Sequence, residues 1–327
     1  MILSVEHLRI EFRTERGLSV PVRDVSFEIP ERGRVALVGE SGCGKSLTAL
    51  ALGGLVDRAK ISGRIAGSPR IAYVFQNPMQ SLNPVMRVGV QIQEGVSSAV
   101  QPSDFNLQSL FASVGLPPGS AEKYPCEMSG GQQQRVMIAM ALAQNPDLLI
   151  ADEPTTALDV TTQQEVLDLI YRLADERQTA VLLITHNLGL VARYAKSVNV
   201  MYAGEIVERG ETREILSAPR HPYTQGLLAA VPRLDAPKDA PLADIAGTVP
   251  PPTDWPTGCA FHPRCKFAIP ACSEAGFNGL CFRLRLGHKD LCLSPCVQPQ
   301  NMVKYRQTRG NGSRVPHLSE IRRIKNG

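Results

Sequence analysis

The chain has 327 residues, which is enough to bury a full α/β core and carry a smaller appendage. It contains no run of about 18 apolar residues, which excludes a membrane-spanning helix, and its first residues lack the basic-then-apolar layout of a signal peptide. We therefore expect a cytoplasmic protein, in which the eight cysteines do not build a disulfide framework.

Two strands are predicted at the N-terminus. Residues 2–12 and 22–29 alternate apolar and polar side chains, and the turn-forming residues 14–17 separate them. Such a hairpin would cover one side of the phosphate site predicted next. Phe12 is the aromatic residue we expect to stack on a bound base, with an ordinary strand position as the alternative.

Residues 39–46 read GESGCGKS, a glycine, four free positions and then Gly-Lys-Ser. In this pattern the glycines let successive N–H groups point into one hollow, the lysine reaches the outer phosphates and the serine hydroxyl ligates Mg²⁺. An apolar run precedes the loop and a helical pattern follows it, as the motif requires. The residues expected at the phosphates are Gly39, Ser41, Gly42, Cys43, Gly44, Lys45 and Ser46.

A further predicted strand, residues 71–75, ends at Gln76. Ligands of open α/β sheets bind at the carboxyl ends of strands, so the Gln76 amide is expected to touch Mg²⁺ or the attacking water. Residues 79–123 then change to helix-like segments interrupted by prolines, which favours a helical insertion.

A second anion site is predicted at residues 129–132, Ser-Gly-Gly-Gln, which precede a helical run. Ser129 can cap this helix, and Gly130 and Gly131 expose backbone donors at its N-terminus. A plain helix cap is the alternative that the residues alone leave open.

The strand 147–151 ends in two acids, Asp152 and Glu153. Asp152 is expected to hold Mg²⁺ and Glu153 to polarise a water for in-line attack. The helix after them is expected to bury one stripe, and the buried strand 180–184 leads to His186, which is placed to meet a γ-phosphate. A short hairpin is predicted at residues 203–204. The stripe consists of Val166, Leu169, Ile170 and Leu173.

Taken together, residues 39–46, Gln76, 129–132, 152–153, 157–159 and His186 resemble the ATPase subunit of an ABC transporter, over residues 1 to about 235. Residues 76–84, 219–224 and 258–265 further resemble the dipeptide/oligopeptide and nickel importer group.

The resemblance implies an α/β fold, a P-loop NTPase (RecA-like) core with an antiparallel β subdomain and a helical insertion, plus a small Cys-rich C-terminal extension. The implied divisions are residues 1–235 for the ATP-binding domain, with the insertion at about 79–135, then 236–296 for a Pro-rich linker and the extension, and 297–327 for a basic tail.

The resemblance also implies roles. Glu153 becomes the general base, His186 the γ-phosphate sensor, and Gln76 the link between Mg²⁺ and a membrane partner. Ser129, Gly130, Gly131 and Gln132 bind the ATP held by an opposite subunit, and Asp159 lies at that subunit interface.

The implied function is ATP hydrolysis with Mg²⁺ that drives peptide import at the cytoplasmic face of the cell membrane. The implied partners are two permease subunits, a second ATPase subunit, identical or related, and an extracytoplasmic solute-binding protein, with no specific nucleic acid. Import of nickel or another small solute, a soluble non-transport ATPase and a non-hydrolysing regulatory subunit are the alternatives. The intact Glu153 and His186 argue against the last.

The C-terminal extension holds a set of cysteines at unusual spacing. Four thiolates in a reduced compartment can enclose zinc or an iron–sulfur cluster, but no Cys-x-x-Cys pair occurs. Some peptide importers similar here bind a 4Fe–4S cluster, so cluster, zinc and no metal all stay open. The expected ligands are Cys259, Cys265, Cys272 and Cys292, with Cys281 as the alternative fourth.

The basic tail carries seven basic residues against one acid, a net charge of +6 after Cys296 in a chain whose total is +4. A solvated tail is the simplest interpretation, and contact with anionic lipid or nucleic acid is the alternative.

Overall fold

The computed structural model describes residues 1–15, 17–96, 105–155, 159–231, 244–274, 282–286 and 289–293. Within these residues nine strands form one mixed sheet in the order β4-β1-β2-β9-β8-β3-β7-β6-β5, and β10 (Phe282–Leu286) pairs with β11 (Lys289–Leu293) separately. The nine strands are β1 (Leu3–Thr14), β2 (Gly17–Ile29), β3 (Arg34–Val38), β4 (Lys60–Ala66), β5 (Ile71–Val74), β6 (Leu148–Asp152), β7 (Ala180–Thr185), β8 (Ser197–Tyr202) and β9 (Glu205–Glu211).

The neighbouring strands β8, β3, β7, β6 and β5 are parallel and form the centre of the molecule. Their side chains are buried on both faces, which is why they appear in the sequence as unbroken apolar runs. In β6, Leu149 and Ala151 join the core on one face, and Leu148 and Ile150 join the core on the other. This arrangement brings the carboxyl ends of β3, β5, β6 and β7 to one edge of the sheet.

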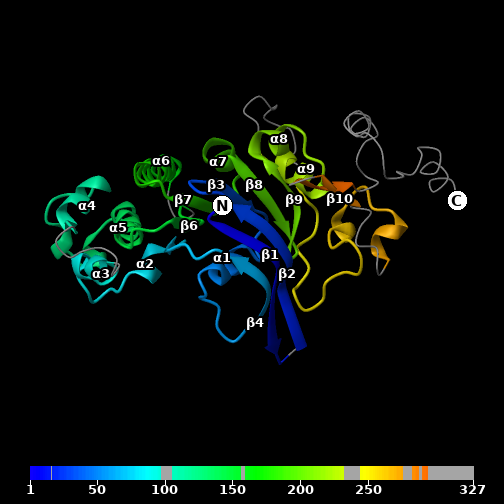
Figure 1. Cartoon of the computed structure of the whole chain (residues 1–327), viewed down its shortest axis with the longest axis horizontal. Helices are drawn as coiled ribbons and strands as arrows, with labels where there is room; N and C mark the ends of the chain where they lie inside the picture. Colours follow the sequence, from blue (N-terminus) through cyan, green and yellow to red (C-terminus); the bar gives the residue numbers. More distant parts are fainter. Residues whose placement is uncertain are drawn as a thin grey trace.

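The helices cover the faces and one end of this sheet (Figure 1). The helices α2 to α5 and two 3₁₀ turns lie between residues 78 and 143, a range that includes residues 79–123, where the sequence predicted helix-like segments. In chain order, the helices and 3₁₀ turns from residue 45 to residue 229 are α1 (Lys45–Leu52), α2 (Pro78–Ser81), α3 (Val88–Glu94), α4 (Leu107–Ser113), η1 (Ser120–Glu122), η2 (Pro125–Glu127), α5 (Gly130–Ala143), α6 (Val160–Arg177), α7 (Leu188–Tyr194), α8 (Thr212–Ser217) and α9 (Pro222–Ala229).

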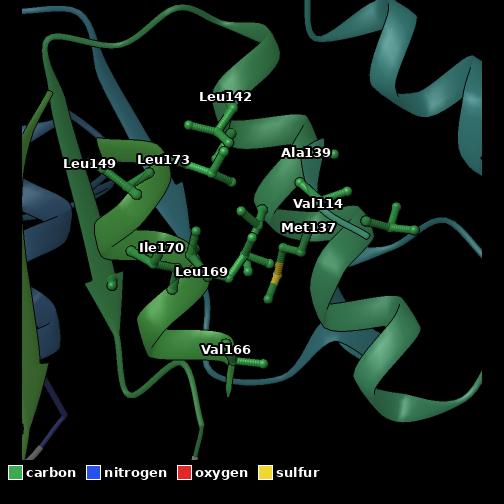
Figure 2. Packing of buried hydrophobic residues seen from close by; sticks show 14 of the residues in the cluster. Val114, Met137, Ala139, Leu142, Leu149, Val166, Leu169, Ile170 and Leu173 are labelled. Atoms are coloured by element: carbon green, nitrogen blue, oxygen red, sulfur yellow. The ribbon is translucent and has the colours of Figure 1, made fainter. Parts of the chain in front are cut away.

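The predicted apolar stripe of α6 is confirmed, because its four residues are at most 6 % exposed. Figure 2 shows them between Leu149 of the sheet and Met137, Ala139 and Leu142 of α5. Burying such side chains contributes about 1.5–3 kcal/mol each. The α6 helix therefore joins the helices of residues 78–143 to the central sheet. The stripe comprises Val166, Leu169, Ile170 and Leu173.

The N-terminal strands extend further than predicted. β1 reaches Thr14 and β2 begins at Gly17, because the hairpin keeps its pairing up to the turn, where the Thr14 hydroxyl donates to the Gly17 carbonyl at 2.8 Å. The edge strand β4 pairs antiparallel with β1 and was not predicted. Its side chains are mostly exposed, so burial leaves little signal in its sequence.

The C-terminal segment, residues 244–274, packs against the body of the molecule rather than standing apart from it (Figure 1). The Pro252 carbonyl accepts a hydrogen bond from the Val20 amide at 2.8 Å, and the Trp255 indole donates to the Val20 carbonyl at 2.9 Å. Phe261 packs on the rings of Tyr202 and Tyr223. The segment also forms η3 (His262–Arg264) and η4 (Pro270–Ser273).

The predicted turn at Ala203 and Gly204 is present, with φ angles of 50° and 78°, and it joins β8 to β9.

The fold class predicted from the sequence, an α/β P-loop core with an antiparallel β part, is confirmed by this sheet. Among the described residues, no helix combines the length and hydrophobicity that crossing a bilayer requires.

Candidate active site

The loop of residues 39–46 connects β3 to α1 and is shaped by its glycines. Gly44 has a φ of 101°, and a Cβ there would lie 2.6 Å from the Pro21 carbonyl oxygen, so only glycine fits. Gly44 is also the N-cap of α1, where no side chain caps the helix and no acid lies in its first turn. Ser41, Gly42 and Ser46 are exposed. The loop therefore presents uncapped backbone donors and an electropositive helix end to an anion.

Lys45 lies inside this loop and is 5 % exposed. Its ammonium donates to the carbonyl oxygens of Gly39 and Glu40 at 2.8 and 2.9 Å. A buried ammonium needs such acceptors, and a phosphate arriving in the loop would supply a charged one. The neighbouring Cys43 is fully buried, so it offers the ligand its backbone and not its thiol.

Asp152 ends β6, and one of its carboxylate oxygens, Oδ1, is buried without a hydrogen-bond partner. Burial raises the pKa of Asp152, while a hydrogen bond with the Ser46 side chain and the charge of Lys45 oppose that rise. An orphaned carboxylate oxygen beside a hydroxyl matches the oxygen ligands that Mg²⁺ takes, so this site fits the metal.

Glu153 follows directly and turns away from its neighbour. Its φ of 46° lies in the left-handed region, a strained conformation for a residue other than glycine. Its amide donates to the Ile184 carbonyl at 2.9 Å, which fixes the turn against β7. As a result its carboxylate lies 3.4 Å from the Gln76 amide nitrogen and 3.2 Å from Nδ1 of His186.

Three predicted residues from three different strand ends thus come together, with Gln76 and His186 both at the Glu153 carboxylate. Gln76 follows β5, Glu153 follows β6 and His186 follows β7, and Gln76 and His186 are exposed. The Glu153 side chain is only 14 % exposed, against 57 % for His186. A sheltered carboxylate held between an amide and an imidazole is suited to orient and deprotonate a water.

The serine and glycines of the second predicted anion site lie at the start of α5, beyond the β5 side of the sheet. Ser129 caps this helix, accepting from the Gln132 amide at 3.3 Å, and the Gln132 side chain accepts from the Ser129 amide at 3.1 Å. A Cβ on Gly130 would have nothing within 4 Å. The site therefore faces outward, and its side chains are used in the cap.

The remaining two residues that were predicted to contact nucleotide or its partner subunit, Asp159 and Phe12, have partners within their own part of the fold. Asp159 caps α6, accepting from the amides of Thr161 and Thr162 at 3.1 and 3.0 Å, and hydrogen bonds from Thr162 lower the pKa of Asp159. Phe12 lies on β1, half-buried and packed against the core of the N-terminal strands. The structure brings neither residue to the phosphate loop through a hydrogen bond.

The predicted cysteine site is not supported. Cys259 and Cys265 are half-buried and Cys272 is buried, and burial raises the pKa of the Cys259 thiol. Nowhere in the described ranges do three or more His, Cys, Asp or Glu side chains group so as to hold a metal ion. Cys281 and the side chain of Cys292 lie outside the described residues. The thiols that are described do not fit a cluster or zinc, so no step below uses one.

The structure brings to this site three residues, Glu40, Tyr223 and Arg264, to which the sequence analysis gave no role. Tyr223 accepts a hydrogen bond from the Glu40 amide at 2.8 Å, and Arg264 donates to both carboxylate oxygens of Glu40. No local pattern shows that these residues contact one another, because Arg264 lies 224 positions from Glu40.

Comparison with known proteins gives a consistent result. A family model described as "ABC transporter" matches residues 22–156, and one described as "Oligopeptide/dipeptide transporter, C-terminal region" matches residues 207–272. A relative from Brucella abortus (strain 2308), named as a peptide import ATP-binding protein, is 44 % identical over 298 residues, covering 83 % of this chain and 89 % of its own. One of the same description from Brucella ovis is 45 % identical over 311 residues, covering 84 % and 92 %.

Two solved structures share the fold. The ATP-binding cassette MJ0796, solved as a dimer in a post-hydrolysis state with ADP and Pi, matches with a TM-score of 0.56 and 26 % identity, over 65 % of this chain and 99 % of its own. The cbiO1 protein of Clostridium perfringens, part of the ABC transporter complex cbiONQ, matches with a TM-score of 0.57 and 26 % identity, over 66 % and 91 %.

Proposed function

This chain belongs to the ATP-binding subunits of ABC transporters, in the group that drives peptide import, and we propose that the site described above is where it binds and hydrolyses ATP. The observation that carries the proposal is the meeting of Gln76, Glu153 and His186 at one carboxylate, at the sheet edge where the phosphate loop and the orphaned oxygen of Asp152 also lie.

In this proposal the loop residues hold the triphosphate of ATP. The backbone donors at the start of α1 and the Lys45 ammonium bind the phosphate oxygens, since both are sources of positive charge. Ser46, Asp152 and Gln76 hold Mg²⁺, which when bound neutralises charge on the phosphates. Phe12 contributes to the face that receives the base.

Glu153 acts on the attacking water. Its carboxylate accepts a proton from the water while the water oxygen attacks the γ-phosphate in line, and the bond to the ADP oxygen breaks. His186 contacts the γ-phosphate in this proposal, which its exposed position 3.2 Å from Glu153 supports, and Gln76, after β5, orients the same carboxylate.

A second ATPase subunit completes the site. Each chain offers one phosphate loop and one Ser129-Gly130-Gly131 turn, and in the sheet order β7, β6 and β5 follow β3 towards the helices that carry that turn. A head-to-tail pair would place the turn, with Gln132 and Asp159, against the nucleotide of the partner. The structure of MJ0796, a dimer bound to ADP and Pi, supports pairing of two such subunits. ATP closes the pair and hydrolysis opens it.

The permease subunits dock on the helices of residues 79–135, the insertion within an ATP-binding domain of residues 1–235. Apolar side chains are exposed here, with Met79 at 73 % and Val85 at 79 %. An open groove lined by Tyr73, Phe75 and Met140 lies beside them. Exposed apolar surface of this kind is typical of a protein interface.

Docking in this way places the chain peripherally on the cytoplasmic face of the cell membrane. The full importer includes an extracytoplasmic solute-binding protein that selects the peptide. The second ATPase subunit is another copy or a related chain. The C-terminal extension, residues 236–296, and the basic tail, residues 297–327, are accessory to this core, and ATP and Mg²⁺ are the only bound groups that the proposal uses.

Replacing the lysine of the loop tests the proposal. Lys45→Ala removes a charge-assisted contact to phosphate and should weaken MgATP binding by about 30- to 100-fold. Titration calorimetry on the full chain measures this, with Lys60→Ala on the exposed strand β4 as the control, which should bind like the wild type. An unchanged dissociation constant for Lys45→Ala contradicts the assignment.

A further inference from the structure

The phosphate loop is attached to the C-terminal segment through one residue, Glu40. Three groups of Glu40 are bonded to three different parts of the chain. Its amide donates to the Tyr223 hydroxyl of α9 at 2.8 Å, and its carbonyl accepts from the Lys45 ammonium at 2.9 Å. Its carboxylate accepts from the Arg264 guanidinium at 2.6 and 2.9 Å. Glu40 therefore joins the lysine of the phosphate site to residues far along the chain.

Arg264 is held in place independently of Glu40. Its side chain is 4 % exposed, and its Nε and Nη2 donate to the carbonyl oxygens of Ala246, Ile245 and Gly247 at 2.9, 2.9 and 3.1 Å. The guanidinium also lies over the Tyr202 ring, 5.8 Å from its centroid. A guanidinium with this many fixed partners presents a rigid fork to a carboxylate.

The same segment is anchored to the sheet beside the loop. Phe261 packs on Tyr202, the last residue of β8, and on Tyr223, and Ala260 and Phe261 are buried with them. On the other side of the loop, Gly39 approaches β8 so closely that a Cβ would lie 2.1 Å from the Met201 carbonyl. Loop and segment thus rest on the same strand end, and the pair between Glu40 and Arg264 connects them directly.

The charge of the pair also matters to an anionic ligand. Glu40 is an acid at the entrance of a site that receives a triphosphate, and an unpaired carboxylate there would repel it. The hydrogen bonds that Arg264 donates to the Glu40 carboxylate raise the pKa of Arg264, so the guanidinium stays charged. Arg264 both cancels this charge and fixes the loop that carries it.

We propose that Arg264 is a positioning residue for ATP binding, which acts through Glu40 to hold the phosphate loop in its ligand-ready shape, so that the fold of the C-terminal segment, residues 244–274, sets the affinity of the site for nucleotide. This rests on the function proposed above. It assigns a role to the C-terminal segment that involves no metal.

The test compares MgATP binding by full-length variants. Arg264→Met should raise the dissociation constant by about tenfold, equal to about 1.4 kcal/mol, and Arg264→Lys, which keeps the charge but not the fork, by a smaller factor. Glu40→Gln should weaken binding by a smaller factor than Arg264→Met, because it breaks the same contact without leaving an unpaired carboxylate beside the triphosphate. The double variant should be no weaker than Arg264→Met alone, since both changes break one contact.

Two further readouts separate positioning from general stability. In the assembled importer, Arg264→Met should raise the KM for ATP with kcat within about twofold of the wild type. Hydrogen exchange at amides 40–45 should be faster while that of β6 and β7 is unchanged. The control is Arg70→Met, which breaks another bidentate pair, with Asp147 at 3.0 and 3.2 Å, at the amino ends of β5 and β6. Its ATP affinity should equal that of the wild type.

The inference is overturned if Arg264→Met and Glu40→Gln both bind MgATP within twofold of the wild type, or if their effects add. If Arg264→Met fails to fold, Glu40→Gln decides alone, because Arg264 keeps its three carbonyl partners in that variant. The Lys45→Ala result separates the two proposals. If Lys45→Ala loses MgATP binding while Glu40→Gln binds like the wild type, the proposed ATP site stands and the positioning role of Arg264 is rejected.

Discussion

Asp152 and Glu153 are adjacent acids with opposite surroundings. Asp152 continues β6 and has a buried oxygen without a partner, whereas the left-handed backbone of Glu153 turns the next carboxylate towards Gln76 and His186. One strand end therefore supplies a metal ligand and a base, and the backbone angle of a single residue separates the two roles.

Glu153→Gln should lower the turnover of the assembled importer by about 10²- to 10⁴-fold, because an amide cannot accept the proton of the attacking water. Binding of MgATP should be kept, and the nucleotide-bound pair of subunits should accumulate, which light scattering can detect. The control is Glu176→Gln in the last turn of α6, where Glu176 pairs with Arg172 on the surface. Wild-type turnover in Glu153→Gln would remove Glu153 from its role.

Asp152→Asn should raise the thermal stability of the protein without nucleotide and reduce the stabilisation that MgATP provides. Burial raises the pKa of Asp152, so its ionised form costs the folded state free energy as the pH rises above the ordinary carboxyl value. Without nucleotide the Asn variant should therefore melt at a higher temperature than the wild type at pH 8, and the difference should shrink towards pH 4. MgATP should raise the melting temperature of the wild type by more than that of the variant. A lower melting temperature of the apo variant at pH 8 contradicts this.

At the scale of one element, α9 depends on an uncharged histidine. His221 is buried and its ring nitrogen caps α9 by accepting from the Tyr223 amide at 3.1 Å. Burial lowers the pKa of His221 from 6.5 to about 4. Tyr223 of this helix also holds Glu40, so the start of α9 connects to the phosphate loop.

Acid should destabilise the protein through this helix. Because the folded pKa of His221 lies below the unfolded one, its contribution is complete above pH 6.5 and is lost as the pH falls towards 4. The loss between pH 7 and pH 5 is about 2 kcal/mol. His221→Asn keeps a capping acceptor without a titrating ring, so urea unfolding at the two pH values should show a smaller loss for the variant. An equal loss in both proteins contradicts the assignment.

At the scale of the whole molecule, the two ends of the large sheet differ in exposed surface. The β5 end has exposed apolar side chains on and beside α2, and the β4 end carries a mostly polar edge strand. Met79→Asp with Val85→Asp should weaken co-purification with the permeases by at least about tenfold, because each charge would be desolvated in the interface. ATP binding by the chain alone should be unchanged.

Ile61→Asp on β4 is the matched control, since Ile61 is an exposed apolar residue, 41 % exposed, in the edge strand at the opposite end of the sheet. It should leave the complex intact. A stable complex with the Met79 and Val85 changes would place the permeases elsewhere.

The sequence predicted the parts of this molecule that depend on local pattern. The buried strands, the stripe of α6 and the Ser129 cap each leave a periodic or short-range signal, and the structure has them where expected. The strand β4 was missed because its pairing with β1 stabilises it more than burial does. The pair of Glu40 and Arg264 was missed because only the folded sheet brings the two together. The cysteine metal site, which the resemblance implied, finds no support among the described residues, since a set of cysteines in the sequence does not fix where the thiols point.

The sequence distance of 224 residues between Glu40 and Arg264 has a consequence for biosynthesis. At about 5–20 residues per second, a ribosome delivers Arg264 roughly 10–45 s after the phosphate loop has been made. During that interval the nascent domain carries its glycine loop and lysine but not the arginine that secures them. On the proposal above, an unfinished polypeptide captures nucleotide poorly, which delays ATP-driven pairing of subunits until the C-terminal segment with Arg264 has been made.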